Sequence, residues 1–97
     1  MDPEQISELT ISDVVRSTAG RDAGDIFYVI GEDHDCLMLA NGKDRPLDKP
    51  KHKKRKHVEK VLRSETRVAE KLRHGDKVLN GELRRDLAFL ARETASE

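Results

Sequence analysis

A dense run of basic residues has the clearest chemical meaning in this sequence. Residues 49–57 read KPKHKKRKH, which is six Lys or Arg and two His with no acid in nine positions. Like charges in such a block repel one another and stay extended unless an anionic partner compensates them. The run therefore predicts contact with a nucleic acid or another acidic surface. A solvated loop and a localisation-like basic tract are the alternatives that the run alone leaves open.

The other chemistry-bearing residues do not suggest a catalytic or metal site. The four histidines lack the spacing of zinc ligands, and the single cysteine, Cys36, lies in an apolar run, as a small core residue would. Asp22 and Asp25 flank Gly24, where capping of a turn explains them better than metal binding. The sequence has no phosphate-cradling GxxxxGK loop and no nucleophile elbow. We therefore expect no enzyme activity, no metal and no cofactor.

Length and composition indicate one small folded domain. The chain has 97 residues and a mass of 11.0 kDa, and 39% of its residues are charged against 35% that are hydrophobic. Its net charge is zero, whereas unfolded chains typically have a high net charge. No apolar run approaches the roughly 18 residues of a membrane span. The start Met-Asp-Pro-Glu has no secretory signature, so we expect a cytoplasmic protein.

The zero net charge conceals a strong asymmetry along the chain. Residues 1–42 contain two basic residues against nine acids, whereas residues 43–60 contain nine basic residues against three acids. Such a change in the sign of the charge indicates that the two segments have different binding partners or different exposure to solvent. The expected organisation is an acidic N-terminal segment at residues 1–10, a β domain at residues 11–62 and a helical extension at residues 63–97.

Short strands separated by turns are predicted for the first half of the chain. The segments predicted as strands are rich in β-branched and aromatic residues or are continuously apolar. Asn41-Gly42 suits a tight hairpin turn between the third strand and the fourth. Strands of this length with frequent turns predict a small meander or barrel. The expected strands are residues 11–18, 25–31, 36–40 and 45–48.

Two amphipathic helices are predicted for the last third. Val68, Ala69 and Leu72 share one helical face, and Gly75 follows as a helix stop. Asn80 is expected to cap a second helix. That helix carries three leucines at helical spacing, Leu83, Leu87 and Leu90. Because the central strands are apolar on consecutive residues, both of their faces need cover, and we expect these helices to provide it.

The first two thirds of the chain resemble a known RNA-binding module. The segment VVRSTAGRDAGDIFYVIGEDHDCLMLANG is similar to the KOW motif. The order AGRDAG, FYVI, LMLANG, RPLDKPKHKKRKHV resembles the bacterial KOW-domain RNA-binding proteins, which are relatives of the fourteen-e, six-e and twenty-seven-e proteins of the large ribosomal subunit. This resemblance spans about residues 11–58. Beyond it, NGELRRDL at residues 80–87 is similar to the C-terminal helix of some bacterial members.

The resemblance implies a small SH3-like KOW β-barrel over residues 11–62, followed by one or two short α-helices. Residues 56–62 fit helical spacing as well as a strand, and the resemblance favours the strand, which would complete a five-stranded barrel. The basic run would then lie in the loop between the fourth and fifth strands, near the KOW turn. The implied fold class is mainly β with C-terminal helices.

The resemblance also implies which residues contact RNA. Gly24 matches the glycine of the KOW turn, with Gly20 and Arg21 in the same turn, although turn geometry alone explains the two glycines equally well. Lysines supply point charges for phosphates, and Arg55 suits a bidentate or stacked contact. The expected RNA-binding residues are Arg16, Gly20, Arg21, Gly24, Lys49, Lys51, His52, Lys53, Lys54, Arg55, Lys56 and His57.

The implied function is non-enzymatic binding of structured RNA, above all large-subunit ribosomal RNA. Ribosomal proteins are further expected partners, and no membrane contact is expected. Because aromatic residues are only 3% of the chain, recognition of RNA shape and backbone is expected rather than recognition of base sequence. A protein-interaction module of the transcription or translation machinery is the alternative, since SH3-like KOW barrels also occur in elongation factors that bind RNA polymerase.

Overall fold

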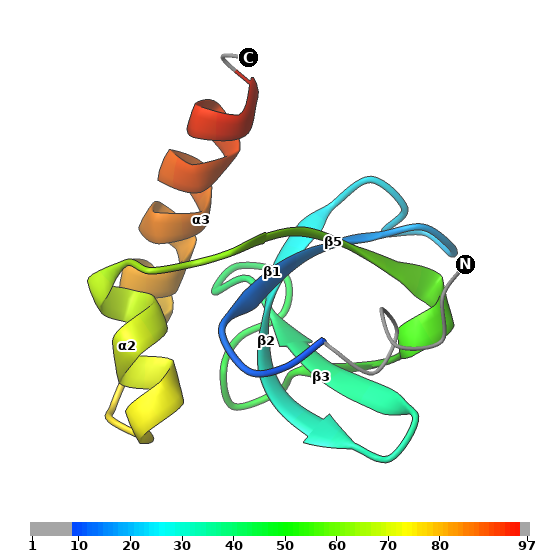
Figure 1. Ribbon diagram of the computed structural model, residues 1–97, viewed down its shortest axis with the longest axis horizontal. Helices are drawn as coiled ribbons and strands as arrows, with labels where there is room; N and C mark the ends of the chain where they lie inside the picture. The colour runs from blue at the N-terminus through cyan, green and yellow to red at the C-terminus, as the bar shows by residue number, and fades with distance from the viewer. Residues whose placement is uncertain (1–8, 96–97) are drawn as a thin grey trace.

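The chain folds into a five-stranded antiparallel sheet with two helices packed beside it (Figure 1). The computed structural model describes residues 9–95. The fold is mainly β with C-terminal helices, as predicted. The elements in chain order are β1 (Asp13–Ser17), β2 (Ile26–Asp33), β3 (Cys36–Ala40), β4 (Lys51–Lys54), the 3-10 turn η1 (Arg55–His57), β5 (Val58–Arg63), α2 (Arg67–His74) and α3 (Asn80–Ala95).

The strands are arranged in the order β4-β3-β2-β1-β5, so the first strand lies inside the sheet and β4 lies at an edge. The first three predicted strands are present, and β5 confirms the strand rather than the helix at residues 56–62. The strand predicted at residues 45–48 is wrong. There the amides of Asn41 and Gly42 both donate to the Arg45 carbonyl, at 2.9 and 3.1 Å, and form a turn. Pairing with β3 resumes only where Lys51 lies opposite Leu39.

Two apolar clusters cover the two faces of the central strands, because neighbouring residues of a strand point to opposite faces. One cluster joins Val58 of β5 to Leu37 of β3, which are not neighbours in the sheet, so the sheet curls around it. Val14 and Tyr28 belong to the other cluster, which α2 and α3 cover. The prediction that the C-terminal helices cover the strands is therefore confirmed for one face, and the curvature of the sheet covers the other.

The helix boundaries follow local capping chemistry. Thr66 caps α2, since its side chain accepts a hydrogen bond from the Ala69 amide, and Gly75 ends α2 with a left-handed φ of 72°. The predicted cap of α3 is wrong in one respect. The Asn80 side chain does not turn back onto its own helix but accepts a hydrogen bond from the Leu47 amide at 2.8 Å. Asn80 thus ties α3 to the loop that precedes β4.

Gly42 allows that loop to approach α3 closely. Its φ is +78°, and a Cβ built there would lie 2.2 Å from the Asn80 carbonyl oxygen and 3.1 Å from the Arg84 nitrogen. Both neighbours are backbone atoms of α3, so neither can swing away as the end of a side chain can. Gly42 is therefore required both by the turn and by the packing of the helix.

Replacing Gly42 with alanine should destabilise the fold more than the same change at Gly75. Both glycines have a left-handed φ, which costs an alanine about 1 kcal/mol. A Cβ at Gly75 meets nothing within 4 Å, whereas a Cβ at Gly42 meets the backbone of α3. We expect Gly42→Ala to lower the free energy of unfolding by about 2 kcal/mol. Chemical denaturation of both variants checks this, and equal losses would contradict the close approach.

The described part of the predicted N-terminal segment belongs to the core. Leu9 is only 4% exposed and packs in the cluster inside the curled sheet. Residues 1–8, which carry most of the predicted acidic segment, lie outside the described residues. Among the described residues, no helix has the length and apolar character needed to cross a membrane.

Candidate nucleic-acid interface

The turn at residues 18–25 and the basic run lie against each other, although Asp22 and Lys53 are 31 residues apart in sequence. The Lys53 Nζ atom lies 2.9 Å from Asp22 Oδ1 and donates to the Ala19 carbonyl at 2.6 Å. The Lys51 Nζ atom lies 2.7 Å from Asp22 Oδ2. The structure thus brings together the two segments that were expected to form one surface.

The turn depends on two glycines with positive φ. Gly20 has a φ of 84° and Gly24 a φ of 95°, and the Gly24 amide donates to the Ser17 carbonyl at 2.8 Å. A Cβ at Gly24 would meet nothing within 4 Å, so the turn needs this glycine for its backbone angle and not for contact with the rest of the chain. Arg21 is exposed in the same turn.

The basic run is an edge strand and a 3-10 turn, not the loop that was predicted. Residues 51–54 pair with β3, and the Lys53 side chain is only 8% exposed whereas those of His52 and Lys54 are exposed. The prediction was wrong because Asp22, whose side chain is only 13% exposed, is a partner for the two lysines on the inner face of β4. Pairing with β3 and neutralisation by Asp22 together overcome the repulsion that would keep the run extended in isolation.

Asp22 is held in its charged form at the base of the turn. Burial alone would raise the pKa of its carboxyl, but hydrogen bonds from Lys51, Lys53 and Ser17 outweigh burial and bring the pKa far below its ordinary value of 3.8. The carboxylate therefore stays ionised and compensates two cations at once. Sequence reasoning assigned Asp22 to turn capping and missed this role. Its position between the two glycines of a turn, four residues before a strand begins, gave no hint of a partner in β4.

Arg55 fixes the far end of the basic run. Its guanidinium donates to the Leu9 carbonyl at 2.8 Å, to the His34 carbonyl at 3.2 Å and to Glu32 at 2.8 Å. Hydrogen bonds from Arg55 and then from Thr10 lower the pKa of the Glu32 carboxyl. The bidentate character expected of Arg55 toward RNA is thus used within the protein, where it joins β2, η1 and the start of the described chain.

Three lysines and one histidine of the run are exposed, and we call them the β4 surface: Lys49, His52, Lys54 and Lys56. No carboxylate of the described residues forms an ion pair with them. Lys54 and Lys56 line a pocket of about 200 Å³ with Arg55 and Asp35. Lysines on an edge strand also prevent pairing with other chains, so this strand has a structural use for them as well. The β4 surface nevertheless has the charge that a phosphate backbone requires.

Of two further expected site residues, Arg16 lies away from the turn, whereas His57 lies beside it. Arg16 forms an ion pair with Glu59 at 3.4 Å and lines the hollow between the sheet and α3. His57 is half-buried, and its carbonyl accepts a hydrogen bond from the Thr18 amide at 2.9 Å. The structure therefore gathers the turn and β4 at one place, whereas Arg16 faces α3.

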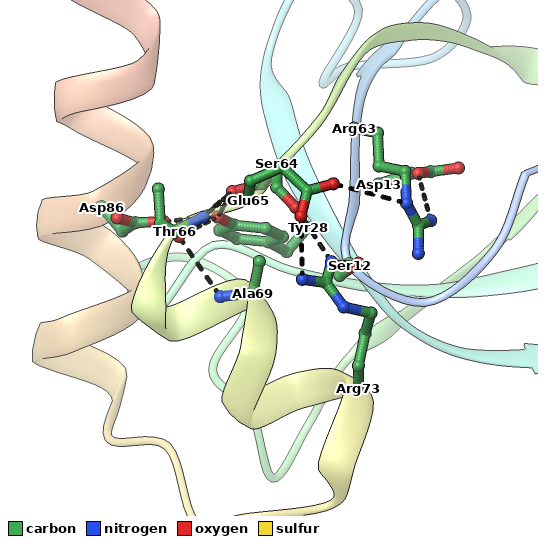
Figure 2. Close-up of polar contacts among 10 residues, drawn as sticks. All are labelled: Ser12, Asp13, Tyr28, Arg63, Ser64, Glu65, Thr66, Ala69, Arg73 and Asp86. Carbon is green, nitrogen blue, oxygen red and sulfur yellow. Dashed lines mark hydrogen bonds and ion pairs between the residues drawn. The ribbon is translucent and has the colours of Figure 1, made fainter.

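A second polar cluster, which sequence reasoning missed, joins the sheet to the helices (Figure 2). Tyr28 is fully buried, and its hydroxyl donates to Asp86 of α3 and lies 2.7 Å from Ser64 Oγ. Thr66 donates to the same carboxylate at 2.8 Å. Burial raises the pKa of Tyr28 to about 12, and the hydrogen bond to Asp86 adds to the effect. The hydroxyl of a tyrosine in an apolar strand is expected to have a hydrogen-bond partner, but no nearby residue in the sequence identifies Asp86 as that partner.

The same cluster fixes α2 to the start of β1. The Arg73 guanidinium donates to Ser12 Oγ at 2.8 Å and to the Ser64 carbonyl at 2.9 Å. Figure 2 shows it reaching from α2 towards the strands, with the ion pair of Asp13 and Arg63 beside it. Because each polar group here is bonded within the protein, the cluster serves as a structural joint.

The described residues hold no group of three His, Cys, Asp or Glu side chains placed to bind a metal. Cys36 is a free, half-buried thiol in β3. No protein-family model matches the chain, and no curated protein matches it. Geometry and charge therefore carry the functional argument.

Proposed function

We propose that this protein is a non-enzymatic RNA-binding module that contacts the phosphate backbone of structured RNA through the β4 surface and the adjacent turn. The observation that carries the proposal is the division of the basic run into two sets. Lys51, Lys53 and Arg55 are held by partners within the protein, and these contacts fix the backbone of β4 and η1. The residues of the β4 surface, which lie between and beyond them, are left exposed.

A rigid support favours binding because less conformational freedom is lost when the lysines meet phosphates. Lysine side chains act as point charges and do not read bases, so contacts of this kind fix position along the backbone. Arg21 in the turn adds a guanidinium that can bind a phosphate through two hydrogen bonds. Phe27 is 1% exposed and Tyr28 is fully buried, which leaves no aromatic ring of β2 for base stacking at this surface.

The resemblance to KOW-domain proteins supports the choice of target. The bacterial KOW-domain proteins that the chain resembles are related to proteins of the large ribosomal subunit, and we propose large-subunit ribosomal RNA as the ligand and the cytoplasm as the place of action. A backbone-reading surface suits ribosomal RNA, whose folded helices present fixed arrays of phosphates.

Removal of two charges from the β4 surface should weaken RNA binding and its dependence on salt. The variant is Lys54→Gln with Lys56→Gln, and its matched control is Arg67→Gln with Lys77→Gln, which removes the same charge from exposed positions in and after α2. If each lysine contacts a phosphate, the log-log slope of affinity against salt should fall in magnitude by about 1.5. Fluorescence anisotropy with an RNA hairpin over a salt series measures the slope. Equal slopes in variant and control would overturn the proposal.

The proposed ribosomal target predicts a second result in cells. Tagged wild-type protein should sediment with the large subunit at low salt and leave it as salt rises, because phosphate contacts release counterions. Sucrose-gradient sedimentation of an extract, with sequencing of the co-migrating RNA, measures this. Migration only with RNA polymerase would replace the ribosomal target with the protein-interaction alternative.

A further inference from the structure

The outward face of α3 is a second cationic surface. Its exposed residues include three arginines, Arg84, Arg85 and Arg92, and no carboxylate of the described chain forms an ion pair with them. Phe89 is 47% exposed and follows Arg85 by one helical turn. The face therefore combines planar guanidinium groups with one exposed ring.

The acids of α3 that have described partners are bonded to other elements of the protein. Glu82 lies 3.0 Å from the Lys71 Nζ atom of α2, and Asp86 accepts hydrogen bonds from Tyr28 and Thr66 in the buried joint. At 100° per residue both acids lie about 160° from Arg84, whereas Glu82 lies only about 60° from Arg85. The three arginines are exposed and these two acids are half-buried and bonded, so the charge that these five residues leave unpaired is positive.

A groove beside α3 continues this positive surface onto the sheet. Two hollows there share Ile26 and Ala91 in their walls. The smaller has a volume of about 200 Å³, a mainly apolar lining, and Lys43 and Arg84 in its wall. The larger has a volume of about 520 Å³ and contains Lys60 and the ion pair of Arg16 with Glu59, so its lining is mixed in charge. The smaller hollow can accept the sugar and base edges of a nucleic acid strand whose phosphates lie on its two cations.

We infer that α3 and this groove form a second RNA-contacting surface, and that the protein joins two segments of structured RNA. The inference rests on the proposed function. Two features favour RNA over the other partners: the apolar part of the face is small, which disfavours a membrane, and Phe89 offers a ring on which a base can stack, which an acidic protein would not use.

The far ends of the two cationic surfaces lie on different sides of the molecule. Figure 1 shows α3 at one side and the green turn η1 at the other, and the molecule measures 32 × 31 × 25 Å. The near ends are closer, because the loop before β4 is bonded to Asn80 of α3. We expect a duplex bound at Lys54 and Lys56 to leave Arg85 and Arg92 free for a second segment of RNA.

The test is a bridging experiment with purified full-length protein. A biotinylated RNA duplex on beads captures the protein, and a fluorescent RNA duplex added afterwards reports a second contact. Wild type and the control Arg67→Gln with Lys77→Gln should both retain the second duplex. The variant Arg85→Gln with Arg92→Gln should bind the first duplex but retain about ten-fold less of the second, since it loses two phosphate contacts. Gln is a good helix former, so α3 should stay folded, and circular dichroism checks this.

The outcomes separate this inference from the proposed function. Absence of any RNA binding by wild type would sink the proposed function itself. RNA binding without capture of a second duplex, or capture that is unchanged in the α3 variant, would overturn only the inference. Loss of polyglutamate binding in the α3 variant with intact RNA bridging would assign the face to an acidic protein instead.

The Phe89→Leu variant should weaken binding of a hairpin with an unpaired loop by about ten-fold and leave duplex bridging intact, because only an unpaired base can stack on the ring.

Discussion

Replacing Asp22 with asparagine should lower the free energy of unfolding by about 3 kcal/mol, because it leaves the buried ammonium of Lys53 and the half-buried one of Lys51 without a counter-charge. Asparagine keeps the shape of the side chain and can still accept hydrogen bonds, so the loss reports the charge. Urea denaturation followed by circular dichroism measures it. Asp25→Asn is the matched control, since Asp25 is exposed in the same turn and its side chain forms no hydrogen bond among the described residues.

The same carboxylate predicts acid sensitivity with a definite sign. The pKa of Asp22 is lower in the folded protein than in the unfolded chain, where it has its ordinary value of 3.8. Its stabilising contribution is therefore complete above that value and is lost as the pH falls below it. The Asp22→Asn variant should lose less stability than wild type over this acidic range.

Adding Lys53→Met to the Asp22→Asn variant should recover part of the lost stability, because a long apolar side chain fills the space without a charge. No recovery would show that the loss has another cause.

Tyr28→Phe should lower the free energy of unfolding by about 2 kcal/mol, because Asp86 then loses a donor in a buried site. Thr66 still donates to the carboxylate, which limits the loss. Ser64 loses one donor at the same time but keeps its hydrogen bonds with Thr66. Denaturation at neutral pH measures the change, and a variant as stable as wild type would contradict the joint between β2 and α3.

Alkaline pH gives an independent measure of the same joint. The pKa of Tyr28 is raised from 10.0 to about 12 in the folded protein, so its contribution is complete below pH 10 and is lost as the pH rises towards 12. The shift corresponds to roughly 2 to 3 kcal/mol. Tyr28 is the single tyrosine of the chain, so the ultraviolet absorbance of tyrosinate reports this group alone. Titration of the hydroxyl at its ordinary pKa would contradict its burial beside Asp86.

The helices and the central strands could be predicted because their signals are local. Leu83, Leu87 and Leu90 are buried as their spacing indicated, and Gly75 ends α2. The spacing of apolar residues along a helix or strand shows which face is buried, even when the partner of that face is unknown.

The location of β4 could not be predicted, because its sequence contains no apolar residue and has no alternating hydrophobicity. KHKK becomes a strand through pairing with β3 and through the carboxylate of Asp22, both of which are distant in sequence. The same reason hid the joint at Tyr28, whose partner Asp86 lies 58 residues away. Long-range polar partners leave no periodic trace in a single sequence.

The separation of the basic run into held and exposed cations affects how its mutants should be interpreted. A variant that neutralises Lys51, Lys53 or Arg55 loses internal ion pairs or hydrogen bonds, so a loss of RNA binding would reflect damage to the support. Variants of Lys54 and Lys56 avoid this problem because both side chains are exposed. Only the exposed positions test binding directly.

The internal position of β1 has a consequence for the growing polypeptide. β1 pairs with β5 on one side, and Asp13 lies opposite Arg63, so β1 is synthesised well before this partner strand exists. Until residue 63 has been made, one edge of β1 exposes unpaired amides and carbonyls next to the apolar Val14 and Val15. Asp22, by contrast, is already present when Lys51 and Lys53 emerge. During synthesis, the lysines of β4 can therefore pair with the Asp22 carboxylate before β5 completes the sheet.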